Sequence, residues 1–286
     1  MTDAPQYALT AFTASDGENL AVYDWPLADD VPQRGTVLLV HGLGEYAGRY
    51  DLLAQRLNAW GFAVRAYDQY GHGQSGGPRG GLNHDMRLLE DLADMVDAAR
   101  AHTPAGLPLV LLGHSMGGLV AARFVSLHMR PVDALVLSSP ALDPGLSAAQ
   151  KLLLATLPRM VPNLRVGNGL QARFISHDTE VVAAYESDPL CHDRISARLG
   201  QFIATAGPAT VARAAHWSVP TLLMWAGDDR LVNPEGSQAF AAAAPPDRVL
   251  AHCFVGLYHE LFNESAELAA PVFGLLQQWL HKQFPQ

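Results

Sequence analysis

The stretch Gly113-His114-Ser115-Met116-Gly117-Gly118 lies directly between two apolar runs, PLVLL at 108–112 and LVAARFV at 119–125. The first run predicts a buried strand, and the second, which has helical spacing, predicts a helix. A G-x-S-x-G motif between them indicates a sharp turn that exposes the serine, because close backbone contacts there tolerate only small neighbours. A helix that begins at this turn favours the negative charge that develops during acyl transfer. Ser115 is therefore the predicted nucleophile.

Strand-like apolar runs alternate with helical patterns on both sides of this motif. We expect helices at 49–60, 86–102, 116–128, 235–244 and 266–283. We expect strands at 7–14, 19–25, 36–41, 62–67, 108–113, 133–138, 220–226 and 249–255. The last six lack polar alternation, as strands covered on both faces do, and Asp16-Gly17 joins the first two as an antiparallel hairpin. The pattern predicts an α/β protein with an eight-stranded, mostly parallel sheet covered by helices on both faces.

Residues 141–217 break this alternation. They show no strand pattern, and their prolines divide them into short helical pieces. About 77 residues are too many for a loop, so we expect a helical cap inserted into a core made of 1–140 and 218–286. The cap carries an apolar cluster of Leu152, Leu153, Leu154, Leu157, Met160 and Val161. Two interpretations stay open: the cluster packs onto the core, or it forms an acyl-chain tunnel or a lid that touches a membrane.

A serine hydroxyl becomes a good nucleophile only when a base takes its proton and an acid orients that base. In this architecture the base belongs on a loop after the last core strand. His259 lies there, whereas His252 falls within the strand and His281 on the terminal helix. His259 is therefore the predicted base.

The acid should follow the end of a strand upstream of His259. Asp228 and Asp229 both follow the strand at 220–226, and Asp143, which opens the cap, is a weaker candidate. Adjacent side chains near a strand end point in different directions, so only one aspartate can meet the imidazole. The residues alone do not choose between Asp228 and Asp229.

Acyl transfer also needs hydrogen-bond donors for the oxyanion. The backbone N–H of Met116, just after the nucleophile, is one, and the N–H of Leu43, in the glycine-rich loop after the third strand, is the other. We expect His41 to brace that loop. The third glycine-rich stretch, 68–75, lacks the pattern of a phosphate-binding loop, so we interpret it as a structural loop near the site.

Composition excludes several classes of function. The chain has 286 residues and a net charge of −9, which disfavours nucleic acid as a partner, and no apolar run approaches the ~20 residues of a membrane span. The two cysteines and the scattered histidines have no metal-ligand spacing, so we expect neither a metal nor another cofactor. Residues 1–20 do not read as a signal peptide, and we expect a cytoplasmic protein. Nothing in the sequence predicts the oligomeric state.

Six motifs occur in a fixed order along the chain. They are HGLGEYAGRY (41–50), YDQYGHGQS (67–75), GHSMGG (113–118), YESDPL (185–190), GDDRLVNPEGS (227–237) and YHEL (258–261). With them the chain resembles, from about residue 10 to 283, the monoacylglycerol lipase and lysophospholipase branch of the α/β-hydrolase superfamily. The resemblance implies the α/β-hydrolase fold. It also implies Asp229 as the acid, because the family's acid precedes R-L in the pattern G-x-x-D-R-L.

The resemblance further implies a serine carboxylic-ester hydrolase that cleaves single-chain fatty-acyl esters, above all monoacylglycerols. The cap should hold an acyl tunnel and a polar cavity for glycerol, and the candidate substrate contacts are His114, Tyr185, Leu153 and Leu157. Animal monoacylglycerol lipases carry histidines where this chain has Tyr46 and Phe262, and both differences should lie near the polar end.

Two alternatives use the same fold. A lysophospholipase or a general short- to medium-chain carboxylesterase would share all of the predicted catalytic residues. A catalytically inactive ligand-binding protein belongs to a different class, and the complete set of serine, histidine and aspartate argues against it. Dehalogenases and epoxide hydrolases of this fold use a carboxylate nucleophile, so Ser115 argues against both.

Overall fold

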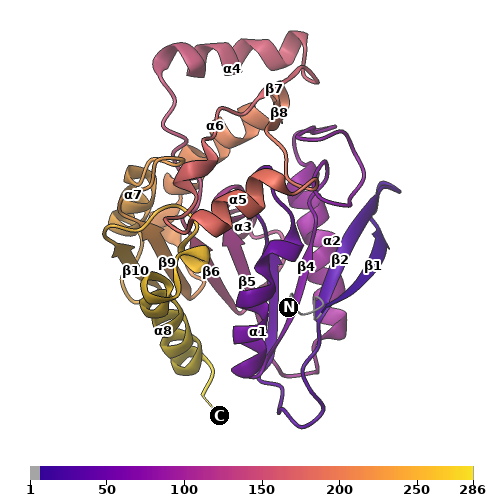
Figure 1. Cartoon of the computed structure of the whole chain (residues 1–286), viewed down its shortest axis with the longest axis vertical. Coiled ribbons are helices and arrows are strands. Elements are labelled where there is room, and N and C mark those ends of the chain that lie inside the picture. The colour runs from indigo at the N-terminus through magenta and orange to yellow at the C-terminus, as the bar shows by residue number, and fades with distance from the viewer. Residues whose placement is uncertain (1–6, 286) are drawn as a thin grey trace.

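The computed structural model describes residues 7–285 (Figure 1). The expectation that residues 1–20 contain no signal peptide falls partly on residues 1–6, which lie outside the described range. An eight-stranded sheet runs through the molecule in the order β1-β2-β4-β3-β5-β6-β9-β10. The strands are β1 (Ala8–Thr13), β2 (Asn19–Trp25), β3 (Gly35–Val40), β4 (Phe62–Tyr67), β5 (Leu109–His114), β6 (Ala134–Ser138), β9 (Thr221–Ala226) and β10 (Val249–Phe254).

The first two strands are antiparallel, and the rest of the sheet is parallel. β1 pairs with β2 as a hairpin, and β2 joins antiparallel to β4. From β4 to β10 every neighbouring pair is parallel, so the carboxyl ends of these strands meet at one edge of the sheet. The functional loops of such sheets lie at that edge.

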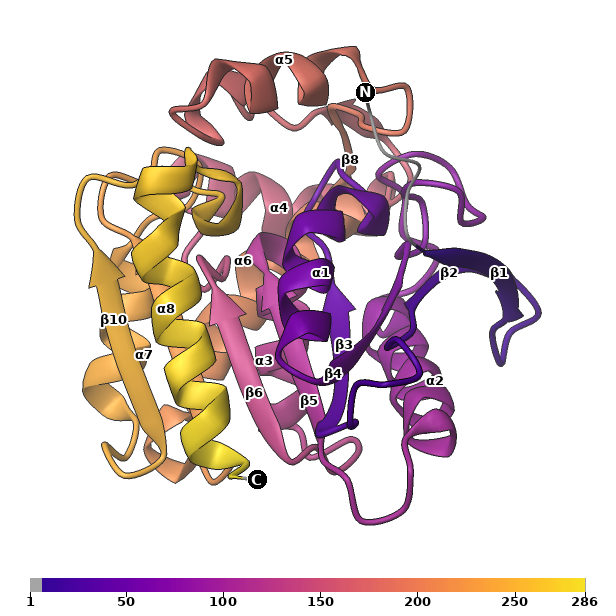
Figure 2. The same cartoon turned by 60° about the horizontal axis from the view of Figure 1, so that its bottom comes forward.

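Helices cover both faces of the sheet, and each face has its own hydrophobic core. Figure 2 shows α1 (Asp51–Ala59) and α8 (Ala266–Gln283) on one face. The other face packs against α2 (Arg87–His102), α3 (Ser115–Ser126) and α7 (Glu235–Ala243), and α6 (Ala197–Val211) lies over α3 and α7. β3 and β5 bury every residue because they lie in the middle of the sheet, under helices on both sides. The predicted α/β-hydrolase architecture is confirmed.

One expectation about the sheet is wrong. β10 was expected to be covered on both faces, but it lies at the edge of the sheet, and Leu250 and His252 are exposed. Its apolar composition resembles that of the central strands, and edge position depends on strand order, which the local sequence does not contain.

The segment between β6 and β9 forms a cap over the carboxyl edge of the sheet (Figure 1). It contains α4 (Ala148–Met160), the 3₁₀ helix η2 (Ala172–Phe174), α5 (Thr179–Ser187), α6 and the 3₁₀ helix η3 (Ala214–His216). Ser147 begins α4 with a capping box to Gln150. α6 packs between α4 and the core helix α3.

The expectation that this segment lacks strands is also wrong. β7 (Arg165–Gly167) and β8 (Arg194–Ser196) form a small antiparallel sheet within it. Three-residue strands are too short to produce a periodic pattern, so hydrophobic periodicity cannot detect them. The boundaries of the cap at 141 and 217 remain a prediction.

Two remaining structural expectations concern membranes and metals. Between residues 7 and 285, no helix has the length and hydropathy of a membrane-spanning segment. Over the same residues, His, Cys, Asp and Glu side chains nowhere gather in threes as ligands for a metal ion. The cofactor-free chemistry stays a prediction, which chelation tests below.

Candidate active site

Ser115 lies on the tight turn that the G-x-S-x-G motif predicts. β5 ends at His114, α3 begins at Ser115, and the backbone of Ser115 has a φ of +53°, in the left-handed region. The glycines on either side of Ser115 leave no room for a side chain. A β-carbon on Gly113 would lie 2.5 Å from the carbonyl oxygen of Gly117, and a β-carbon on Gly117 would lie 2.1 Å from the carbonyl oxygen of Val40. The small neighbours therefore permit the strained turn that presents the serine at the edge of the sheet.

His259 lies on the loop after β10 and pairs with Asp229, on the loop after β9. The Nδ1 of His259 is 2.6 Å from Oδ2 of Asp229, and both side chains are almost completely buried. The other oxygen, Oδ1, accepts the N–H groups of Leu231 and Val232 at 2.9 and 3.0 Å. These bonds fix the carboxylate, and the carboxylate fixes the ring with Nε2 free for other chemistry.

The other two candidate acids do not reach His259. Asp228 is exposed, and the carboxylate of Asp143 accepts hydrogen bonds from the N–H of Gly145 and the side-chain amide of Asn233. Of the three candidates, Asp229 is the one that contacts His259, and its role as the acid stays a prediction.

The two partners change each other's pKa. Burial alone would lower the pKa of His259, but the Asp229 carboxylate opposes this and holds the pKa above the ordinary value. Burial alone would raise the pKa of Asp229. The contact with His259, together with the N–H groups of Leu231 and Val232, brings that pKa below its ordinary value. His114 lies 4.8 Å from His259, ring centre to ring centre, and burial lowers its pKa to about 3, so it adds no positive charge. The site therefore contains a base stronger than free imidazole.

The loop after β3 lies directly against Ser115. A β-carbon on Gly42 would lie 3.1 Å from the Cβ of Ser115. Within the described part of the chain, the N–H of Leu43 has no protein acceptor. Met116 is the second residue of α3, where a backbone N–H has no partner inside the helix. Both N–H groups proposed from sequence as oxyanion donors are thus available beside the serine.

The neighbouring loops hold this arrangement in place, as the sequence predicts. The Nε2 of His41 accepts the N–H of Gln69 at 2.9 Å, and Nδ1 of His41 lies 2.8 Å from the carbonyl oxygen of Gly42. Asp68, in the third glycine-rich stretch, accepts the N–H groups of Ala47 and Gln74. His41 is therefore a brace for the loop, and the stretch 68–75 is structural.

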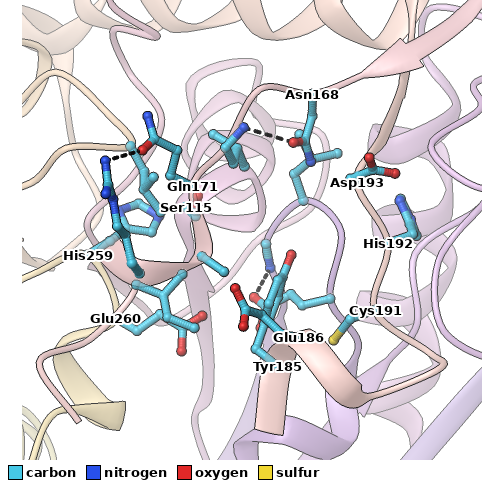
Figure 3. A pocket seen from close by; sticks show the side chains of 18 of the residues that line it. Ser115, Asn168, Gln171, Tyr185, Glu186, Cys191, His192, Asp193, His259 and Glu260 are labelled. Atoms are coloured by element: carbon cyan, nitrogen blue, oxygen red, sulfur yellow. Dashed lines mark hydrogen bonds between the residues drawn. The ribbon is translucent and has the colours of Figure 1, made fainter. Parts of the chain in front are cut away.

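Two cavities meet at Ser115, one largely apolar and one with many polar and charged side chains. An apolar cavity of about 350 Å³ runs beneath α4 and is lined by Leu153, Leu154, Leu157, Leu164, Val166, Leu170 and Ile203 among others. A polar cavity of about 700 Å³ holds Ser115 and His259 and is lined by Asn168, Gln171, Arg173, Tyr185, Glu186, His192, Asp193 and Glu260 among others (Figure 3). Ser115 lines both.

The four candidate substrate contacts divide between these cavities. Leu153 and Leu157 line the apolar cavity, whereas His114 and Tyr185 line the polar one. The ring of Tyr185 covers the guanidinium of Arg49 at 4.9 Å, and its hydroxyl donates to the carbonyl of Gly44 at 3.3 Å. Tyr185 therefore also holds the cap on the loop after β3.

The two departures from the animal enzymes lie close in the chain to residues that line the polar cavity but do not line it. The Tyr46 hydroxyl donates to Oδ2 of Asp188 at 2.8 Å and so joins the core to the cap. Phe262 is buried and packs against Phe273 in the core. Neither side chain lines the polar cavity, because local spacing from a motif does not show which way a loop residue points.

The sequence reasoning missed a buried ionic cluster next to the site. Arg49 contacts both Glu45 and Glu260, which line the polar cavity. Glu45 and Arg49 stand four residues apart in HGLGEYAGRY, and Glu260 directly follows His259. Charged residues inside apolar or glycine-rich motifs were the available signal, but their pairing depends on the tertiary fold.

The site combines a serine on a strand-to-helix turn, a buried imidazole held by a carboxylate, and free N–H donors next to the serine. On this sheet, that combination defines a serine hydrolase of the α/β-hydrolase class. A family model described as "Serine aminopeptidase, S33" matches residues 31–266, and the chain belongs to this family. It is a serine ester hydrolase.

Several relatives extend this result. A monoacylglycerol lipase of Mycolicibacterium smegmatis is 37% identical over 247 residues, 85% of this chain and 87% of that protein. Phospholipase YtpA of Bacillus subtilis is 32% identical and covers 84% of this chain and 93% of its own length. The crystal structure of Paleococcus ferrophilus monoacylglycerol lipase is similar with a TM-score of 0.81 at 32% identity, over 93% of this chain and 99% of that one. The resemblance noted in the sequence is confirmed, and these relatives support hydrolysis of lipid esters.

Proposed function

We propose that the protein hydrolyses single-chain fatty-acyl esters, above all monoacylglycerols, to a fatty acid and an alcohol. The observation that carries this proposal is the meeting of an apolar and a polar cavity at Ser115. An ester with one acyl chain and a hydroxylated alcohol has the same division into an apolar and a polar part. The monoacylglycerol lipases among the relatives support the same substrate class.

In this proposal Ser115 attacks the ester carbonyl while His259 takes the hydroxyl proton. The N–H groups of Leu43 and Met116 stabilise the oxyanion, and Asp229 stabilises the imidazolium. His259 then gives the proton to the leaving alcohol, which departs into the polar cavity. Water activated by His259 attacks the acyl-enzyme and releases the fatty acid from the apolar cavity.

A lysophospholipase is the second candidate. The polar cavity of about 700 Å³ has room for an alcohol larger than glycerol, and one relative is a phospholipase. A panel of monoolein, lysophosphatidylcholine and p-nitrophenyl acetate separates the two by kcat/KM. We expect monoolein to give the highest value, and a higher value for lysophosphatidylcholine would favour the second candidate.

The test of the mechanism is Ser115→Ala. We expect it to abolish labelling by a fluorophosphonate and to reduce turnover to the residual ~10³–10⁴-fold over water that oxyanion and binding contacts give. Circular dichroism should show an unchanged fold. Activity near that of the wild type in this variant would contradict the proposed mechanism.

A further inference from the structure

Arg49 lies buried between two carboxylates next to the proposed catalytic residues. Its guanidinium is 2.5 Å from Oε2 of Glu45 and makes two hydrogen bonds to Glu260, at 2.7 and 2.8 Å. The three side chains are 10%, 4% and 6% exposed. The paired geometry with Glu260 is the strongest form of a charge-assisted hydrogen bond between these groups.

Each carboxylate is attached to a different part of the site. Oε1 of Glu45 accepts the N–H of Gly42 at 2.5 Å and the hydroxyl of Tyr50 at 2.6 Å, so it holds the loop that carries the Leu43 N–H. Glu260 directly follows His259 in the chain. Arg49 therefore joins the loop after β3, which carries Leu43, to the loop after β10, which carries His259.

The same cluster meets the cap. Tyr185 stacks on the Arg49 guanidinium, and the N–H of His192 donates to the carbonyl of Gly44 at 2.8 Å. The N–H of Glu260 donates to the carbonyl of Ile175 in the cap at 2.8 Å. The two catalytic loops and the cap are thus fixed to one another around one guanidinium.

A buried ionic cluster of this kind is a weak source of stability, because desolvation of three charges opposes their attraction. Its strict geometry is more useful for defining position. We propose that Arg49, held between Glu45 and Glu260, is a positioning residue that keeps the Leu43 N–H and His259 in register with Ser115. This inference rests on the proposed function.

The cluster also acts on His259 through charge, because two carboxylates share one guanidinium. The groups that face His259 are Asp229, Glu260, Glu45, His114 and Arg49. After Asp229, the carboxylates of Glu260 and Glu45 add to the raised pKa of His259. Removing the charge of Glu260 should therefore lower this pKa, whereas a change that only loosens the loop should leave it in place.

Three variants of the full-length protein test the inference. Arg49→Lys keeps the charge but cannot form the paired contact, and Glu260→Gln keeps the shape but loses the charge. Glu264→Gln is the matched control: Glu264 is buried in the same loop and accepts the N–H of Tyr258 and of His177, but it does not contact Arg49. For each variant kcat, KM, melting temperature and the pH dependence of kcat/KM are measured on monoolein and p-nitrophenyl acetate.

We expect Arg49→Lys to lower kcat by roughly 10- to 100-fold on both esters with KM little changed, since small misplacements in a catalytic site cost this much. Glu260→Gln should lower kcat and move the acidic midpoint of kcat/KM to lower pH. Glu264→Gln should lower the melting temperature and leave the midpoint unchanged.

Two results would overturn the inference: a wild-type kcat in Arg49→Lys, or a midpoint in Glu260→Gln that stays in place or rises. Failure of the proposed function would appear differently, as a wild-type protein that turns over neither ester and is not labelled at Ser115 by a fluorophosphonate. That result would remove this inference as well.

Discussion

The pair of His259 and Asp229 depends on which of two adjacent aspartates faces the ring. The Asp229 side chain is buried, with Oδ2 2.6 Å from the imidazole Nδ1, whereas Asp228 is exposed and its backbone N–H donates to the carbonyl of Leu257. Successive side chains after a strand point to opposite sides, so one residue of register changes which carboxylate reaches the base. A comparison of two single substitutions therefore tests the geometry directly.

Asp229→Asn should lower kcat/KM by about 10⁴-fold, because the amide would favour the wrong tautomer of His259 and could not stabilise the imidazolium. Asp228→Asn is the matched control and should stay within a few-fold of the wild type. Steady-state kinetics on p-nitrophenyl acetate measures both. A severe loss in Asp228→Asn with a mild one in Asp229→Asn would show that the loop after β9 is shifted by one residue.

The pH dependence of the wild type follows from the raised pKa of His259. The imidazole must be neutral to take the serine proton, so activity is low where it is protonated and rises as the pH passes its pKa. Because Asp229 holds that pKa above the ordinary 6.5, the acidic midpoint of kcat/KM should lie above 6.5. A pH–rate profile on a short soluble ester gives the midpoint, and a value below 6.5 would contradict the charge balance described for the site.

Sequence reasoning could single out the candidate catalytic residues because each stands beside a strand end or in a spaced motif. The G-x-S-x-G turn is encoded locally, since Gly113 and Gly117 leave no room for a β-carbon. The contacts of Arg49 are not encoded locally, because its partner Glu260 lies 211 residues away. The choice between Asp228 and Asp229 needed either the resemblance or the structure.

At the scale of the element, α4 has two different faces. Leu154 and Leu157 point toward the apolar cavity, and Leu154 rests where α6 carries Gly200. On the outside, Leu152 and Met160 are 69% and 82% exposed. Part of the cluster is therefore not buried in the core, and its role as tunnel or lid stays a prediction. Transient contact with a membrane through the outer face remains a prediction.

The inner face can be tested with Leu157→Asp. An unpaired carboxylate in an apolar tunnel is strongly unfavourable to an acyl chain, so kcat/KM on p-nitrophenyl octanoate should fall about tenfold or more. Turnover of p-nitrophenyl acetate should change little, because the acetyl group does not reach the tunnel. Equal losses on the two esters would show that Leu157 only stabilises the cap.

A substitution on the outer face should affect vesicle-bound substrate and leave soluble esters unchanged. Leu152→Asp should leave both soluble p-nitrophenyl esters unaffected and reduce turnover of monoolein in phosphatidylcholine vesicles roughly tenfold, since an exposed leucine that enters lipid contributes about 1.5–3 kcal/mol. Sedimentation with the same vesicles measures binding directly. Unchanged vesicle binding and turnover would exclude α4 as a membrane contact.

The core elements followed from the sequence more closely than the cap did. Long apolar runs such as β3 and β5 are buried on both faces, so their composition alone reveals them. The strands β7 and β8, with three residues each, and the exposed face of β10 depend on neighbours that are distant in sequence. Periodicity cannot report such neighbours.

At the scale of the whole molecule, the proposed mechanism uses side chains and backbone N–H groups, and both cysteines are free thiols. We therefore expect full activity after dialysis against EDTA and in the presence of a strong reductant. The assay is monoolein hydrolysis before and after each treatment. A loss with EDTA that a divalent ion restores would require a metal site that this mechanism does not contain.

The sizes of the two cavities set the range of substrates. The apolar cavity of about 350 Å³ is one continuous space beside Ser115, and each methylene buried in it should contribute about 0.8 kcal/mol, roughly a fourfold gain in affinity. We expect kcat/KM for monoesters to rise with acyl length between C8 and C18 until the cavity is full. Triolein would have to place two further chains in the polar cavity, where Glu186, Asp193 and Arg173 line part of the wall and would lose water to them. Long-chain triacylglycerols should therefore be hydrolysed at least about a hundredfold more slowly than monoolein, measured by fatty-acid release from matched emulsions. Comparable rates on triolein and monoolein would mean that the cap opens far enough to admit all three chains, and the cavities would then not determine the substrate.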